Sequence, residues 1–403
     1  MSSDLVFDPV SEEYFTGAQK TYRRLRDEAP VYRNSDQDFY ALSRYDDVAA
    51  AYKDWQTFTS TQGIMLDQMC IPGFDGTQMP GFLGLYDPPL HLRMRTLTSS
   101  ALTPSKLTAV EDAVRQAVAT RLAELEGKDS PDFVNDFAMK FGADILYRLM
   151  GIPEDDYEKI AEMVARFLSA GEEGQESATN PGRVQATMEL VGYFSGLAGV
   201  KRASTDDDVI TRMVKASFVD DQGEEQSLSD IEVGGYLMQL FAAGVESSAK
   251  LTSGTYVMLH RTQEWKKVVD DPSLIPAALL ETGRLEPPVQ FLGRKTTRDV
   301  TLHGTTIPKG ASVLLLMAAG NRDERAFPDP DAFRLDRELV KQPLTFGMGP
   351  HACMGKHLAE LQGRIALTEF ARRYPDATPV EEGLKRARAI HTFGWQEVPL
   401  RLA

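Results

Sequence analysis

One cysteine near the C-terminal end of the sequence lies in surroundings that favour chemistry at sulfur. Cys353 belongs to FGMGPHACMGKHLAE, residues 346–360, in which a glycine-containing loop leads into helix-forming residues. A thiol at the start of a helix meets unpaired backbone N–H groups and the positive end of the helix dipole, and both favour the thiolate. The thiolate is the form that binds metal ions and attacks electrophiles. The segment therefore predicts a metal ligand or a nucleophile.

The residues next to Cys353 leave several roles open. A buried structural cysteine beside a turn is the simplest. His351 and His357 could join Cys353 in a zinc site, although their spacing matches no common zinc motif and no second ligand pair occurs elsewhere in the sequence. A nucleophilic cysteine needs a base, and the sequence identifies none. The glycines allow the chain to turn tightly here and let a flat group approach closely.

The pattern around Cys353 is more specific than the cysteine itself. Phe346-Gly347-x-Gly349-x-His351-x-Cys353-x-Gly355 resembles the haem-binding loop of the cytochrome P450 family. The resemblance covers almost the entire chain, and the length fits the soluble bacterial type. Other motifs similar to those of the family precede the loop in the expected order: DPPLHLRMR at 87–95, Ala243-Gly244-Val245-Glu246-Ser247, Glu281-Thr282-Gly283-Arg284 and FPDPDAFRLDR, which ends at Arg337.

The resemblance implies a role for each of these residues. Cys353 would be the iron ligand of haem b, and Glu281, Arg284 and Arg337 would form a structural triad behind the cysteine loop. Buried propionates need cationic or N–H partners to offset their desolvation. The positions that match the family's haem contacts are His91, Arg95, Arg294, His351, Phe346, Gly347 and Gly355.

Four residues of the distal helix are the catalytic candidates. The small residues Ala243 and Gly244 would leave room for dioxygen, and Glu246 and Ser247 would deliver protons to it. The family usually has threonine where this chain has Ser247, and serine lacks the methyl group that restricts χ1. We expect the relay to work with a less firmly placed hydroxyl. The alternative is that Ser247 only bonds back to a carbonyl of its own helix.

The resemblance implies a haem-thiolate monooxygenase that inserts one oxygen atom from O2 into a hydrophobic small molecule, by hydroxylation or O-dealkylation. Because no reductase domain is fused to the chain, a separate ferredoxin and its NAD(P)H-dependent reductase would supply electrons. A basic patch near Lys356 and Arg364 could bind an acidic ferredoxin. The alternatives are a peroxygenase, a haem-thiolate isomerase or dehydratase, and a haem sensor or carrier. The acid–hydroxyl pair favours the monooxygenase.

The apolar pocket is predicted by position alone. Residues 61–86 form a long loop with large apolar side chains, which is typical of a lid. The candidates for the pocket wall are Met65, Met69, Phe74, Phe82, Phe167, Leu240, Phe241, Val289, Gln290, Phe291 and 392–395.

The elements that must position these residues are mainly helices. A hairpin and a helix are expected within 30–54, helices from 104 to 270 with a break at 169–182, strands within 294–321, and one hairpin within 390–402. Ser229 and Glu232 have capping-box spacing and predict the start of a buried helix over 230–261. The pattern therefore predicts a mainly α fold with minor β sheets in a single domain, 1–403. The resemblance implies that this is the cytochrome P450 fold, with haem between a distal helix and the cysteine loop.

The overall composition restricts the possible partners. A formal net charge of -15 argues against binding to nucleic acid or to an anionic membrane. The start of the sequence predicts neither a signal peptide nor a membrane anchor. Two cysteines without repeated spacing cannot make a disulfide framework, so we expect a cytoplasmic protein.

Overall fold

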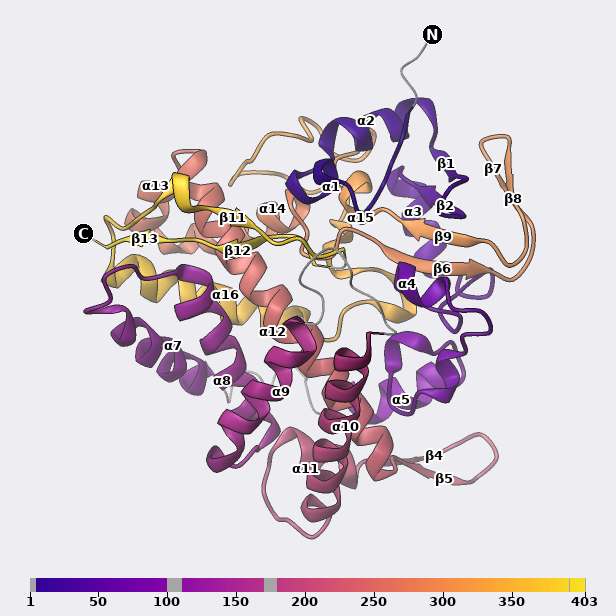
Figure 1. Cartoon of the computed structure of the whole chain (residues 1–403), viewed down its shortest axis with the longest axis horizontal. Helices are drawn as coiled ribbons and strands as arrows, with labels where there is room; N and C mark the ends of the chain where they lie inside the picture. Colours follow the sequence, from indigo (N-terminus) through magenta and orange to yellow (C-terminus); the bar gives the residue numbers. More distant parts are fainter. Residues whose placement is uncertain (1–4, 100–110, 170–179, 391, 403) are drawn as a thin grey trace.

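A long helix, α12 (Asp230–Arg261), crosses the middle of the molecule (Figure 1). The computed structural model describes residues 5–99, 111–169, 180–390 and 392–402. At the start of α12 the N–H of Ser229 donates to the Glu232 carboxylate at 2.9 Å, and the N–H of Glu232 donates to the Ser229 hydroxyl at 3.4 Å. This capping box satisfies two N–H groups that the helix itself cannot. The predicted helix and its start are confirmed.

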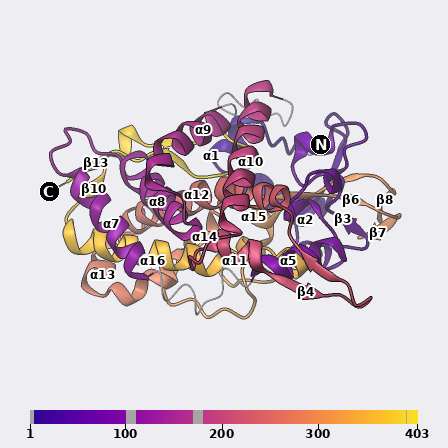
Figure 2. The ribbon, with the colours of Figure 1, turned by 90° about the horizontal axis from the view of Figure 1, so that it is seen from below.

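The helices from α7 to α16, apart from α15, form one helical core with α12 and bury most of the apolar side chains (Figures 1 and 2). They are α7 (Glu111–Leu125), α8 (Met139–Met150), α9 (Tyr157–Ser169), α10 (Pro181–Lys201), α11 (Val209–Lys215), α13 (Trp265–Asp270), α14 (Ile275–Leu285) and α16 (Lys356–Arg373). The predicted helical region is confirmed from residue 111 onward, whereas 104–110 and most of the expected break, 170–179, lie outside the described residues.

A five-stranded sheet lies beside this helical core, at the right of Figure 1. Its order is β1 (Val31–Asn34), β2 (Phe39–Leu42), β9 (Ser312–Leu315), β6 (Leu292–Thr296) and β3 (Phe58–Thr59). β2 and β9 are parallel, and the other neighbours are antiparallel. Short helices pack near the sheet: α1 (Glu12–Thr16), α2 (Gln19–Glu28), α3 (Tyr45–Lys53) and α15 (Met317–Gly320).

Most of the predicted strands are confirmed, but two parts of the β structure differ from the prediction. The hairpin of β7 (Val300–Leu302) and β8 (Thr305–Ile307) lies within the range predicted to form strands and turns at His303 and Gly304, which have φ angles of 49° and 78°. The C-terminal hairpin is wrong, because its two strands pair with earlier segments: β12 (Trp395–Glu397) with β11 (Lys385–Arg386), and β13 (Leu400–Arg401) with β10 (Thr378–Pro379). The hairpin of β4 (Ser217–Val219) and β5 (Glu225–Ser227) was not predicted.

The long segment 61–86 is mostly loop, with one short helix, α4 (Leu66–Met69), and two 3₁₀ turns, Gly76–Gln78 and Leu83–Leu85. It leads to α5 (Leu90–Ser99), the helix that carries His91 and Arg95. Gly81 lies so close to α12 that any side chain there would collide with the backbone of Glu232 and Tyr236. The segment is therefore held against the N-terminal half of α12.

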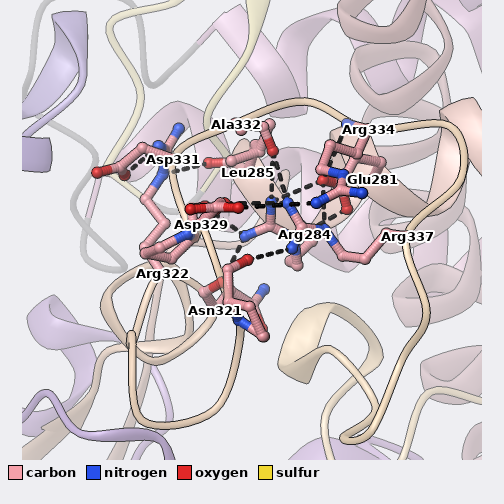
Figure 3. A network of polar contacts seen from close by, with 12 residues as sticks. Glu281, Arg284, Leu285, Asn321, Arg322, Asp329, Asp331, Ala332, Arg334 and Arg337 are labelled. Carbon is pink, nitrogen blue, oxygen red and sulfur yellow. Dashed lines mark hydrogen bonds and ion pairs between the residues drawn. The ribbon is translucent and has the colours of Figure 1, made fainter.

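A buried ion cluster holds the chain that precedes the cysteine loop (Figure 3). Arg284 donates to both carboxylate oxygens of Glu281, at 2.7 and 2.9 Å, and Arg337 donates to Oε1 of Glu281 at 2.7 Å. The three side chains are 0, 3 and 6% exposed for Arg284, Glu281 and Arg337. The predicted triad is thus confirmed as a contact. The guanidinium groups also donate to main-chain carbonyls of Asn321, Pro328, Asp329, Pro330 and Ala332.

Gly283, between Glu281 and Arg284, brings helix α14 close to the start of the cysteine loop. A Cβ at this position would lie 3.1 Å from Thr345 and 3.5 Å from Leu251 of α12. The Thr345 hydroxyl donates to the Gly283 carbonyl at 2.7 Å. A glycine inside this helix therefore has a packing reason, which the sequence alone does not reveal.

We expect Glu281→Gln to lower the free energy of unfolding by about 3–5 kcal/mol, because it leaves two buried guanidinium groups without a counter-charge. Urea unfolding of the cofactor-loaded protein, followed by circular dichroism, measures this change. The control is Asp270→Asn, which breaks an exposed pair with Lys266, whose side chains are 62 and 79% exposed. That variant should keep the wild-type midpoint. Equal midpoints for both variants would contradict the assignment.

Candidate functional site

The loop before Cys353 is closed by main-chain bonds and depends on two glycines. The N–H of Cys353 donates to the carbonyl of Phe346 at 2.8 Å. Gly347 and Gly349 have φ angles of 65° and 67°, a region that other residues adopt at a cost. A Cβ on Gly349 would also lie 2.6 Å from the main-chain oxygen of Tyr52. The backbone therefore favours glycine at 347 and 349, whereas Gly355 has a φ of -82°, which other residues adopt readily.

The Cys353 sulfur faces the start of α16. The N–H groups of Gly355 and Lys356 are directed at the sulfur and lower its pKa, but burial is the larger effect and raises the pKa of the thiol. Protein atoms surround the thiol on most sides, but part of the Cys353 residue is still exposed to solvent. A bound cation would reverse this balance, because a metal stabilises the thiolate outright. The thiol is thus placed to bind a metal ion while having little tendency to ionise alone.

The arrangement does not support a zinc site at Cys353. His357 is exposed and lies 3.6 Å from Glu360 of its own helix. Within the described ranges of the chain, no group of three or more His, Cys, Asp or Glu side chains is arranged to hold a metal ion. Any metal at Cys353 would need further ligands that come with a cofactor.

Four of the predicted cofactor residues come together from three parts of the chain. His91 and Arg95 come from α5, Arg294 from β6 and His351 from the 3₁₀ turn Gly349–His351. The imidazole centroids of His91 and His351 are 4.3 Å apart. Arg95 donates to the carbonyls of Pro350 and Ala352, at 2.9 and 2.8 Å, so it also fixes the loop before Cys353.

Two members of this cluster are buried without full hydrogen bonding. His91 and Arg294 are each 2% exposed. In the part of the chain that the structure describes, Nε2 of His91 and one terminal nitrogen of Arg294 have no hydrogen-bond partner. Buried polar groups are normally paired, and an unpaired donor costs free energy. An unpaired imidazole nitrogen beside an unpaired guanidinium N–H therefore suits a ligand that accepts hydrogen bonds, and the guanidinium charge favours an anionic one.

The charge balance of the cluster leads to the same conclusion. Burial, together with neighbouring His351 and Arg95, lowers the pKa of His91 to about 3. Burial likewise lowers the pKa of His351, although Asp87 opposes this. Asp87 lies 3.9 Å from His351 and accepts bonds from Thr59 and from the N–H of Ser60. A ligand with two carboxylates would supply the missing negative charge, and the propionates of a haem fit this requirement.

The distal residues lie in the middle of α12. The Ser247 hydroxyl donates to the Ala243 carbonyl at 2.6 Å, the back-bond considered above. A Cβ on Gly244 would lie 3.3 Å from Leu146 of α8, so this glycine is also needed for helix packing. Glu246 accepts from the Thr392 hydroxyl at 2.9 Å and pairs with Lys250 at 2.5 Å. Lys250 was missed by sequence reasoning, although its i,i+4 spacing from Glu246 was a usable signal.

Several residues predicted for the pocket wall lie elsewhere. Phe241 is buried in the helical core, where its ring stacks on Tyr147 with centroids 5.3 Å apart. Phe291 packs on Tyr14 in the core beside the sheet. Met69 and Phe74 line a cavity of about 810 Å³ that also contains the charged residue Lys295. The lining of that cavity includes no residue of α12 or of the cysteine loop, so it is separate from the catalytic candidates.

Comparison with known proteins identifies the family. The cytochrome P450 family model matches residues 182–399, more than half of the chain. Cytochrome P450 130 of Mycobacterium tuberculosis is 34% identical over 98% of both chains. 6-Deoxyerythronolide B hydroxylase of Saccharopolyspora erythraea is 30% identical over 91% of both. The ligand-free structure of cytochrome P450 TbtJ1 has a TM-score of 0.85 at 33% identity, covering 96% of this chain and 97% of that one.

The chain belongs to the cytochrome P450 family of haem-dependent monooxygenases. It is therefore an oxidoreductase that uses molecular oxygen. The predicted family and the mainly α fold with small sheets are confirmed. No helix in the described ranges is both long and apolar enough to cross a membrane.

Proposed function

We propose that the protein binds haem b through Cys353 and oxidises a hydrophobic small molecule by hydroxylation or O-dealkylation. The observation that carries this proposal is the pairing of an accessible thiol at a helix start with a buried, undercompensated cationic cluster. Haem with a thiolate ligand supplies dioxygen activation, since the thiolate favours O–O cleavage. The relative that is named as a hydroxylase of 6-deoxyerythronolide B supports hydroxylation as the reaction type.

The chain's own residues would bind and orient the haem. His91, Arg294 and His351 would donate to its propionates, and Arg95 would keep the cysteine loop in place through its two carbonyl contacts. Phe346, Gly347 and Gly355 would shape the loop against the haem face. The N–H groups of Gly355 and Lys356 would stabilise the negative charge on the Cys353 sulfur.

Glu246 and Ser247 would carry protons to the oxygen side of the site, where Ala243 and Gly244 leave room. For this step the Ser247 hydroxyl has to leave the Ala243 carbonyl, to which it donates in the structure. A serine hydroxyl changes rotamer more easily than a threonine hydroxyl, because it lacks the branching methyl group. The observed back-bond is therefore compatible with a relay that forms during turnover.

A separate ferredoxin and an NAD(P)H-dependent reductase would supply the electrons. The Lys356 side chain is 39% exposed at the start of α16, close to the Cys353 side of the molecule. Arg364 is equally exposed but is paired with Glu111 at 3.2 Å. Lys356 is paired less closely, with Glu360 at 3.9 Å, and is therefore the better candidate contact for an acidic ferredoxin.

The cysteine assignment gives a spectroscopic expectation. The reduced, haem-loaded protein should show the strongly red-shifted Soret band that carbon monoxide gives opposite a thiolate. Cys353→Ser should lose that band, because the band requires a thiolate ligand and a serine hydroxyl cannot supply one. Cys70→Ser is the matched control, since Cys70 is the only other cysteine of the chain, and it should keep the band. A wild-type protein without the band would contradict the proposal.

The propionate assignment predicts weaker haem binding in Arg294→Leu. Loss of a charge-assisted hydrogen bond should speed haem dissociation by about tenfold to a hundredfold. The measurement is haem transfer from the purified protein to excess apomyoglobin. Arg298→Leu, four positions further along and with a side chain that is 70% exposed, is the control and should release haem at the wild-type rate. Equal rates for all three proteins would rule out this role of Arg294.

The relay assignment predicts more peroxide from Ser247→Ala. The assay contains NADPH, a surrogate ferredoxin and its reductase. The amount of hydrogen peroxide released per NADPH consumed should increase by about twofold or more, because loss of a proton donor slows productive O–O cleavage. Ser248→Ala changes the adjacent, buried serine and should behave as wild type. If Ser247→Ala has wild-type peroxide release, Ser247 has no part in proton delivery.

A further inference from the structure

Lys250 is a buried ammonium group on the distal helix. Its side chain is only 4% exposed, and it lies one helical turn after Glu246. Nζ donates to Oε1 of Glu246 at 2.5 Å, to the Thr392 hydroxyl at 2.8 Å and to the Thr392 carbonyl at 3.1 Å. These bonds occupy the three N–H donors of a protonated lysine. The ammonium is thus fully used between one carboxylate and one residue of the C-terminal segment.

The C-terminal segment 392–394 is built around the Lys250 side chain. A Cβ on Gly394 would lie 2.7 Å from Cβ and 2.8 Å from Cγ of Lys250, so only glycine fits against this lysine. Gly394 also has a φ of 153°, which other residues rarely adopt. The N–H of Phe393 donates to the Pro288 carbonyl at 2.6 Å, which fixes the segment on its other side.

The contacts of Lys250 decide where the Glu246 carboxylate lies. Oε1 accepts from Lys250 and from the Thr392 hydroxyl, while the adjacent Ser247 donates to the Ala243 carbonyl instead. The Glu246 side chain is still 22% exposed, so it is not locked by burial alone. The two proposed relay residues are therefore bonded to different partners, and Lys250 holds one of them.

Stability does not account for a lysine at this position. Transfer of an ammonium into the protein interior costs several kcal/mol, and a well-packed apolar side chain of similar volume is often as stable as a buried ion pair. Methionine has nearly the same shape and would fill the space beside Gly394. What Lys250 adds over such an apolar side chain is a fixed position for the Glu246 carboxylate.

We propose that Lys250 is a positioning residue that holds Glu246 against Thr392 and away from Ser247, and so links proton delivery to the C-terminal segment 392–394. This inference rests on the proposed function, because it assumes that Glu246 delivers protons. A movement of the segment would break the Thr392 contacts and leave the carboxylate bonded to Lys250 alone. Lys250 itself touches no reacting atom.

The first test uses dioxygen alone as the oxidised substrate, with NADPH, a surrogate plant-type ferredoxin and its reductase in excess. Two NADPH and two protons reduce O2 to two waters, and one NADPH and one proton reduce it to hydrogen peroxide. Lys250→Met frees the carboxylate and should raise the rate of O2 consumption by about fivefold. Glu246→Gln should lower the rate, and the double variant should match Glu246→Gln. Lys266→Met is the control, because Lys266 also pairs with a carboxylate four residues away, Asp270, but on the exposed surface. This variant should consume O2 at the wild-type rate.

The double variant separates positioning from a general structural effect. If Lys250 acts through Glu246, its removal has no further effect once the carboxylate is gone. An unchanged or slower rate in Lys250→Met overturns the proposal. So does a fivefold rise that persists in the Glu246→Gln background.

The second test needs no turnover. Amide hydrogen exchange of Phe393 and Gly394 in the haem-loaded protein should be at least about tenfold faster in Lys250→Met than in wild type. Thr392→Val removes only the hydroxyl contacts and should also speed exchange, so it provides the test if Lys250→Met does not fold. If Phe393 and Gly394 exchange in the variants as slowly as in wild type, Lys250 is not coupled to segment 392–394. A wild-type protein that lacks the red-shifted band or consumes no NADPH refutes the proposed function instead, and the exchange result still decides the link.

Discussion

The Cys353 thiol is costly to ionise where it lies, and much of the structure compensates for that cost. Burial raises its pKa, while the N–H groups of Gly355 and Lys356 act in the opposite direction. They can point at the sulfur only if the loop before it turns twice through a left-handed backbone, at Gly347 and Gly349. Under the proposed function, the iron of the cofactor would complete the compensation. The loop and the start of α16 therefore act as one electrostatic unit around the sulfur.

Two clusters of buried charge in this protein differ in one physical respect. Around Glu281 every charge has a partner, and the guanidinium groups of Arg284 and Arg337 also bond main-chain carbonyls. Around His91 and Arg294 the charges are mostly positive, and buried nitrogens have no bond partner among the described residues. A satisfied cluster fixes the fold, whereas an unsatisfied one marks a place for a ligand. The first cluster comes from residues 281–337, which precede the cysteine loop, whereas the second joins α5 and β6 to His351 of the loop itself.

The distal helix combines a requirement for packing with a requirement for polarity. Its C-terminal half is buried along most of its length, so each polar group in it must bond its own backbone or a defined partner. Ser247 uses the first solution, and Glu246 with Lys250 uses the second. The consequence is that the proposed proton carriers are held in a resting arrangement, and turnover has to rearrange at least one hydrogen bond.

The sequence by itself determined the family, the long helix with its capping box, the cysteine and the residues of both charge clusters. These are local or strictly spaced patterns, and a motif preserves spacing whatever the surrounding packing. Tertiary contacts alone show that Phe241 belongs to the core, that the last strands pair with β10 and β11, why Gly283 is a glycine, and that Glu246 and Lys250 both bond Thr392. Each of these depends on contacts between segments far apart in the chain, most clearly Lys250 with Thr392, and no local pattern encodes such contacts.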